Sequence, residues 1–160
     1  RCDFMPASKD DVVRTIHEWQ REIEQVASSL PDAAWSRGVY EQGWNAKQLF
    51  CHLSESSGVA SFLIGMAGAP ARAGGGAIDI DDWNAQRVSA LQDKPLSALL
   101  DHLRGSCERD IAAVQAAPDD LLSREIQTPW GAQGPLADII VQSIREHGGM
   151  HLADLRAAAG

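Results

Sequence analysis

The stretch DVVRTIHEWQREIEQVASSLP, residues 11–31, determines the class of fold. Its apolar residues recur at alternating intervals of four and three, the spacing of one face of an α-helix, and they are Val12, Ile16, Trp19, Ile23, Val26 and Leu30. Ser8 is a favourable N-cap, and Asp11 three residues later comes close to a capping box. Pro31 stops the stripe, because proline cannot continue a helix. The stretch therefore predicts a long amphipathic helix that buries one face.

Three further stretches carry apolar stripes with helical spacing. One begins near Asn45, a good N-cap, and ends at the glycine-rich segment 68–80. Another begins at Pro95, a residue that suits a first helical turn, and the last begins at about Leu136. A shorter helix is predicted to start near Asp81. Four helices of roughly 20 residues and one short extra helix predict an all-α four-helix bundle.

The segments around these helices bear on topology and domain organisation. The connections 31–44 and 68–80 are long for helices that simply alternate in direction, so we expect at least one long crossing connection. We expect 68–80 to be a mobile surface loop. No repeat or second-domain boundary divides the chain, which predicts one domain over residues 1–160. Residues 1–7 are expected to be flexible or an upstream extension, because Met5 begins a plausible start.

Composition and charge bear on the partners of the protein. Of its 160 residues, 44% are hydrophobic, and 22 acidic residues against 14 basic ones give a net charge of −8. Because such a surface repels phosphate, we expect neither nucleic acid nor a membrane as a partner. No stretch approaches the roughly 20 apolar residues that span a bilayer. Three cysteines without a Cys-x-x-Cys pair favour a reducing compartment, so we predict a cytoplasmic protein.

Three histidines fall on stripes that should face the core. His147 and His151 are four residues apart, so on a helix they share a face and lie about 6 Å apart along the axis. His52 lies on the inward stripe of the second helix. Three imidazoles can therefore converge inside one bundle and bind a divalent metal, with coordination positions left open for water or substrate. The alternative is that each histidine is an ordinary core residue with its own hydrogen bonds.

Three other residues are predicted neighbours of this group. Glu55 lies one turn after His52, and Asp154 lies three residues after His151. Either carboxylate can accept the second ring N–H of a ligand histidine, or ligate the metal directly. Trp130 stands in a turn before the last helix, where it can line the mouth of a pocket.

The glycines between the last two histidines raise a separate question. Gly148 and Gly149 each cost about 1 kcal/mol relative to alanine in a helix interior. A metal that bridges His147 and His151 would hold this turn together. Alternatively, the glycines let a neighbouring helix approach closely, or they break the helix and spoil the spacing of the histidines.

Three segments together resemble the DinB-like superfamily of helical bundles. GWNAKQLFCHL, residues 43–53, resembles the tryptophan-to-histidine segment that opens the second helix of that superfamily. IDIDDWNAQRV, residues 78–88, is similar to the acidic and aromatic segment of the mycothiol-dependent maleylpyruvate isomerase branch. EHGGMHLADLRAA, residues 146–158, resembles the final helix with its two histidines. The resemblance extends from about residue 10 to residue 158.

The resemblance implies a four-helix bundle, commonly a homodimer, with a divalent metal on a histidine triad. Carried over by position, the triad is His52, His147 and His151, and the metal is zinc, nickel, iron or manganese. Members with known activity are metal-dependent S-transferases or isomerases that use a low-molecular-weight thiol such as mycothiol, bacillithiol or glutathione. The isomerase branch has glutamate in place of His147 and a further C-terminal domain, so the resemblance does not extend to the isomerase reaction itself.

Three hypotheses of function remain open. The first is an enzyme in which a divalent metal activates a thiol or water toward a small electrophilic substrate. The second is a protein that binds a small molecule in the same pocket without turnover. The third is a structural, dimeric helical bundle whose histidines belong to the core.

Overall fold

Helix α1 (Lys9–Ser29) forms where the apolar stripe predicts it. The capping box is present: the backbone N–H of Asp11 donates to Oγ of Ser8 (3.2 Å), and the N–H of Ser8 donates to the Asp11 carboxylate (2.9 Å). The helix ends just before Pro31, and its stripe of apolar residues is buried. The local pattern therefore fixes both ends of this helix.

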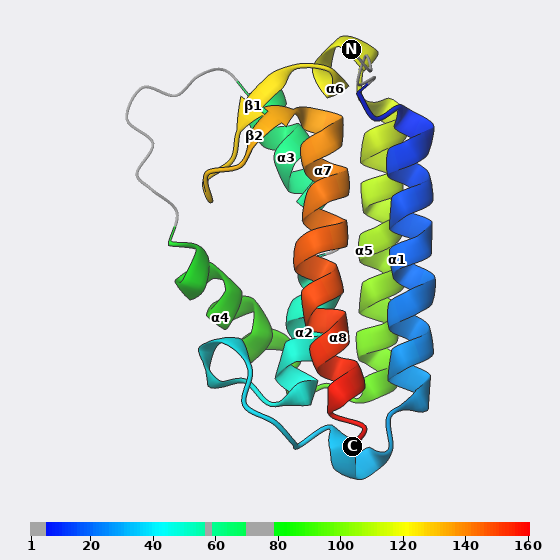
Figure 1. Ribbon diagram of the computed structural model, residues 1–160, viewed down its shortest axis with the longest axis vertical. Helices are drawn as coiled ribbons and strands as arrows, with labels where there is room; N and C mark the ends of the chain where they lie inside the picture. The colour runs from blue at the N-terminus through cyan, green and yellow to red at the C-terminus, as the bar shows by residue number, and fades with distance from the viewer. Residues whose placement is uncertain (1–5, 57–58, 70–78) are drawn as a thin grey trace.

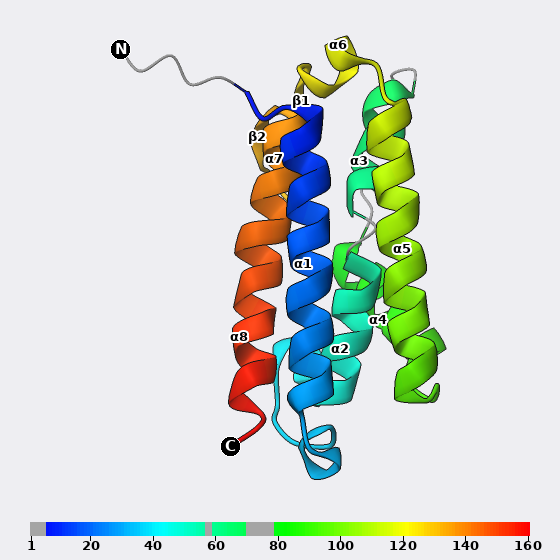
Figure 2. The ribbon, with the colours of Figure 1, turned by 90° about the vertical axis from the view of Figure 1, so that its right-hand side faces the viewer.

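The computed structural model describes residues 6–56, 59–69 and 79–160, and its long helices form a four-helix bundle (Figures 1 and 2). α1 packs against α5 and α7. α2 and α3, which together form the second helix of the bundle, both pack against α5. The elements after α1 are η1 (Asp32–Ala34), η2 (Glu41–Gly43), α2 (Ala46–Ser56), α3 (Val59–Gly68), α4 (Ile80–Leu91), α5 (Leu96–Ala116), α6 (Asp119–Leu122), β1 (Glu125–Gln127), β2 (Gln133–Pro135), α7 (Leu136–Ser143), η3 (Ile144–Gly148) and α8 (Gly149–Ala157).

The direction of the helices confirms the predicted crossing connection. In Figure 1, α1 and the α7–α8 pair run downward, whereas α2–α3 and α5 both run upward. The part of the chain between α3 and α5 therefore returns from one end of the bundle to the other, and α4 belongs to it. The short extra helix predicted near Asp81 is α4, whose N-cap Asp79 accepts from the N–H groups of Asp81 and Asp82.

The second long helix is divided into two, which the sequence pattern does not predict. α2 begins after Asn45: the backbone N–H of Gln48 donates to Oδ1 of Asn45, and the backbone N–H of Asn45 donates to Oε1 of Gln48, both at 3.0 Å. α3 begins anew at Val59, and its first N–H groups donate to the carboxylate of Asp110 on α5, from Ala60 at 3.3 Å and Ser61 at 3.0 Å. A buried carboxylate from another helix thus supplies the cap of α3.

The last helix is continuous, but its middle turn is a π-helix. This turn, η3, contains His147 and Gly148 and joins α7 to α8. Gly148 lies against α1: a Cβ placed on it would be 2.9 Å from Cζ3 of Trp19. Gly149 has no such neighbour within 4 Å in the described part of the chain. Close approach of a neighbouring helix therefore accounts for Gly148, and the glycines do not break the helix.

A small hairpin precedes the last helix. β1 and β2 pair antiparallel, with Ile126 opposite Gly134. Trp130 lies in the turn between the strands, where it is 45% exposed and stacks on Phe62 of α3 with ring centroids 6.5 Å apart. The sequence predicts the turn that carries Trp130 but not the pairing of β1 with β2.

Some predictions concern residues outside the described ranges. Residues 1–5 of the predicted flexible start and residues 70–78 of the predicted loop are among them. Among the described helices, none is both long and apolar enough to cross a membrane. Cys51 and Cys107 are buried.

Candidate metal centre

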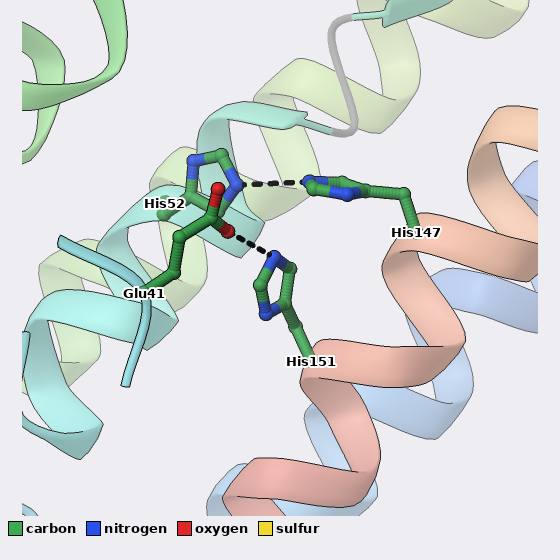
Figure 3. A group of neighbouring side chains, drawn as sticks. All are labelled: Glu41, His52, His147 and His151. Atoms are coloured by element: carbon green, nitrogen blue, oxygen red, sulfur yellow. Dashed lines mark hydrogen bonds and ion pairs between the residues drawn. The ribbon is translucent and has the colours of Figure 1, made fainter. Parts of the chain in front are cut away.

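Three elements bring the predicted histidines together (Figure 3). His52 comes from α2, His147 from the π-turn η3 and His151 from α8. The Nε2 atoms of His52 and His147 are 3.2 Å apart, and the ring centroids of His147 and His151 are 4.5 Å apart. π-turns within α-helices frequently occur at functional sites, and this one presents two of the three rings. The sequence-based prediction that the rings meet thus agrees with the structure.

Burial favours the neutral form of His52 and His147. His52 and His151 are only 4% and 1% exposed, and His147 is the more accessible of the three. Burial, followed by the proximity of His147 and His151, lowers the pKa of His52 to about 3. Burial and His151 also lower the pKa of His147, although Glu41 opposes this shift. A metal binds the deprotonated form of a histidine ring. His52 and His147 therefore each have a ring lone pair available at neutral pH.

His151 has unsatisfied nitrogen atoms in the protein interior. Oε2 of Glu41 lies 2.9 Å from its Nε2, and Oδ2 of Asp154 lies 3.6 Å from its Nδ1. Even so, neither ring nitrogen has a hydrogen-bond partner among the described residues. Leaving a buried polar atom unpaired costs about 1–3 kcal/mol. An ordinary core histidine is expected to have its ring nitrogens hydrogen-bonded, and His151 departs from that expectation.

The spacing of the nitrogens fits a metal ion. Zinc binds imidazole nitrogen at about 2.0–2.1 Å, so two nitrogens in tetrahedral coordination lie about 3.3 Å apart. The 3.2 Å between the Nε2 atoms of His52 and His147 agrees with this value. Ligand atoms from these two rings, His151 and Glu41 all lie within 4.8 Å of one another. The residues therefore fit a divalent transition-metal cation, because such cations bind both imidazole nitrogen and carboxylate oxygen.

Glu41 is the residue that sequence analysis missed. It lies on η2, in the connection before α2, and its side chain points toward His52 and His151 (Figure 3). A periodic pattern cannot identify it, because the residue belongs to no stripe. The available signal is weaker: an acidic residue stands shortly before the N-terminus of the helix that carries His52.

The three predicted neighbours of the triad have different surroundings. Asp154 lies beside His151, as its spacing predicts. Glu55 does not join the histidines: its carboxylate accepts from Nε of Arg87 at 2.8 Å and lies 2.5 Å from Nε2 of His102. These contacts connect α2 to α4 and α5, and a role of Glu55 beside His52 stays a prediction. For Trp130, a place at the mouth of a pocket stays a prediction.

The family model of the mycothiol maleylpyruvate isomerase N-terminal domain matches residues 16–156. The chain belongs to this family. The match and the fold also confirm membership of the DinB-like superfamily, which the three sequence segments predicted. No curated protein sequence matches the chain.

Solved structures of low sequence identity share the fold. A histidine-to-alanine mutant of the mycothiol-dependent maleylpyruvate isomerase aligns with a TM-score of 0.71 at 15% identity, covering 93% of this chain and 61% of that one. The chain therefore spans about three fifths of the isomerase. YfiT from Bacillus subtilis, described as "a probable metal-dependent hydrolase with an unusual four-helix bundle topology", aligns with a TM-score of 0.71 at 18% identity. That alignment covers 99% of this chain and 90% of YfiT.

Proposed function

We propose that this protein binds one divalent cation through His52, His147 and His151 and uses it in thiol chemistry. The reaction would be an S-transfer or isomerisation in which a low-molecular-weight thiol adds to a small electrophile. The observation that carries the proposal is the convergence of three rings of which one, His151, is buried with both nitrogens unpaired within the described structure. Zinc, nickel, iron and manganese are the candidate cations.

The chemistry follows from the properties of such a centre. A divalent cation held by His52, His147 and His151 would supply a Lewis acid that lowers the pKa of a bound thiol, so that the nucleophilic thiolate is available near neutral pH. The protein's own contribution is to hold the three rings in place and to bury His52 and His151 away from water. In the proposed addition the sulfur would form a bond to an electrophilic carbon, the π bond at that carbon would break, and the proton released by the thiol would be returned to the resulting anion.

Family membership supports thiol chemistry without identifying the substrate. The isomerase with the same fold is mycothiol-dependent, and YfiT is described as metal-dependent. The proposal does not include the isomerase reaction, because this chain has His147 where the resemblance gives glutamate. The homodimer and the cytoplasmic location remain predictions.

Elemental analysis of protein purified without added metal or chelator tests the metal site. We expect about one equivalent of a divalent metal in the wild type and less than about one tenth of that in His147→Ala, because loss of one ligand weakens a three-histidine site severely. His17→Ala is the matched control, because His17 is an exposed histidine on α1. Unchanged metal content in His147→Ala would remove the basis of the proposal.

A thiol-transfer assay separates the enzyme from the other two hypotheses. The metal-loaded protein is incubated with mycothiol, bacillithiol or glutathione and a fluorogenic electrophile, and formation of the conjugate is followed. We expect one thiol to react faster with loaded wild type than with His147→Ala. Metal binding without acceleration by any thiol would favour a small-molecule binding protein. Absence of metal from the wild type would favour a structural bundle.

A further inference from the structure

The carboxylate of Glu41 approaches the histidines from outside the helical bundle. Its Oε2 lies 2.9 Å from Nε2 of His151, yet the two atoms do not meet the geometry of a hydrogen bond. Figure 3 shows the carboxylate between the rings of His52 and His151, with His147 on the opposite side. The two atoms lie within ion-pair distance without hydrogen-bond geometry, and two ligands of one cation have a similar spacing.

The turn that carries Glu41 has an energetically unfavourable backbone conformation. Gln42 has φ 57° and ψ 18°, the left-handed region, and Gly43 follows with φ 77°. For a residue other than glycine this conformation costs about 1 kcal/mol. Two backbone hydrogen bonds close the turn, from the N–H of Tyr40 to the carbonyl of Trp44 (2.8 Å) and from that of Gly43 to the carbonyl of Tyr40 (2.9 Å).

The turn is also attached to elements on both of its sides. The hydroxyl of Tyr40 donates to the backbone carbonyl of Asp154 on α8 at 3.2 Å. The amide of Gln42 donates to the carboxylate of Asp81 on α4, also at 3.2 Å. Because α8 carries His151, the first of these bonds sets the position of Glu41 relative to that ring. The placement of the carboxylate is therefore built into the structure.

We propose that Glu41 is the fourth protein ligand of the cation bound by the three histidines. The inference rests on the proposed metal site and adds to it a ligand of a different charge. Three neutral imidazoles leave the full double charge of the cation in a largely buried place, and one carboxylate halves it. Carboxylate oxygens bind zinc at about 2.0–2.2 Å, so Glu41 is chemically suited to that position.

The location of Glu41 explains how a four-ligand centre can admit a substrate. Its side chain is 40% exposed, whereas that of His151 is 2% exposed. Glu41 also lies on a turn, while the three histidines lie on packed helices. An incoming thiol would therefore be able to replace the Glu41 carboxylate at the cation without movement of a helix.

The test measures zinc affinity of metal-stripped protein by competition with a chromogenic chelator. We expect Glu41→Gln and Glu41→Ala to weaken zinc binding at least about 30-fold, since even residues outside the ligand shell contribute 10–100-fold. Glu146→Gln is the matched control: it removes one negative charge next to His147, and Glu146 is exposed. We expect the control to change affinity less than about threefold.

A second measurement reports the ligand set directly. Co²⁺ replaces zinc, and its visible absorption depends on the number and type of ligands. We expect the spectrum to change in Glu41→Gln and to remain that of the wild type in Glu146→Gln. Circular dichroism of the metal-free variants confirms that they are folded.

The outcomes separate the inference from the proposed function. If both Glu41 variants keep the affinity and the Co²⁺ spectrum of the wild type while His147→Ala loses them, Glu41 is not a ligand and the three-histidine site stands. If the wild type itself binds neither zinc nor cobalt, both the proposed metal site and the inference about Glu41 are wrong.

Discussion

Asp110 and His151 are both almost completely buried, but their polar atoms have opposite surroundings. Asp110 on α5 is 0% exposed and His151 on α8 is 1% exposed. The Asp110 carboxylate accepts from the N–H groups of Ala60 and Ser61 and from the Ser61 hydroxyl. His151, in contrast, receives no hydrogen bond from any residue that the structure describes.

The difference separates a polar group that the fold satisfies from one that it leaves unpaired, and it supports the proposed role of His151 as a metal ligand. Asp110 satisfies the N-terminus of α3, so the protein itself supplies its partners. His151 lies beside two other rings and a carboxylate that do not form hydrogen bonds with it in the described structure. Burial alone therefore does not point to a functional residue, whereas a buried group without partners calls for an explanation, and the proposed cation provides one.

The largest expected effect is the stabilisation that zinc confers through His151. At a free zinc concentration 1,000 times Kd, binding to the folded state adds about 4 kcal/mol to the free energy of unfolding. We expect urea titrations to show this increment in the wild type and none in His151→Ala. Asp110→Ala should keep the increment. An increment that survives in His151→Ala would place the cation away from this residue.

Asp110→Ala should cost about 3 kcal/mol with or without zinc, because three donors lose their acceptor in the core. Burial raises the pKa of Asp110 to about 6 from 3.8, although its hydrogen bonds oppose the shift. The folded state therefore holds the proton more tightly, and this contribution is full below pH 3.8 and lost as pH rises through 6. The cost of the substitution should accordingly be larger at pH 4 than at pH 7.

Urea titrations of the wild type and Asp110→Ala across pH 4–7 measure this dependence. The control is Asp101→Ala on the same helix, whose side chain is 77% exposed and whose cost should stay below about 0.5 kcal/mol. A cost that rises between pH 4 and pH 7 would contradict the assigned direction of the pKa shift.

Gly148 and Gly149, which lie between His147 and His151, provide a matched pair of substitution sites. Gly148→Ala places a methyl group against Trp19, and such overpacking costs about 1–3 kcal/mol. Gly149→Ala meets no atom of the described chain within 4 Å and should be neutral or stabilising by up to about 1 kcal/mol. Because Gly148 lies between His147 and His151, its substitution should also weaken zinc binding. Thermal unfolding and chelator competition check both effects, and equal results for the two variants would exclude a role for the Trp19 contact.

Local patterns predict most of the helices. The stripe of α1 and its capping box involve residues no more than four apart, so sequence alone locates both ends. The division between α2 and α3 depends instead on Asp110, which approaches from α5. A cap supplied by a distant residue leaves no trace in the periodicity of the helix that it caps.

The residues of the candidate site show the same contrast between features that the local sequence pattern predicts and features that it does not. His52, His147 and His151 lie on helix faces, so their convergence can be predicted from spacing and the bundle architecture. Glu41 lies on a turn whose geometry depends on the left-handed backbone of Gln42. Left-handed turns are usually signalled by glycine at that position, and a glutamine there gives no such signal.

The smallest expected effect tests Glu55, which is one turn from His52 and yet belongs with the satisfied groups. Glu55→Gln keeps the shape of the side chain but removes the charge that Arg87 and His102 face. We expect a loss of about 1 kcal/mol of stability, since the pair with Arg87 is partly exposed and screened by solvent. Zinc affinity should not change, because the carboxylate does not contact His52 in the described structure. A tenfold loss of zinc affinity in this variant would instead restore Glu55 as a partner of the metal ligands and weaken the distinction between satisfied and unsatisfied groups.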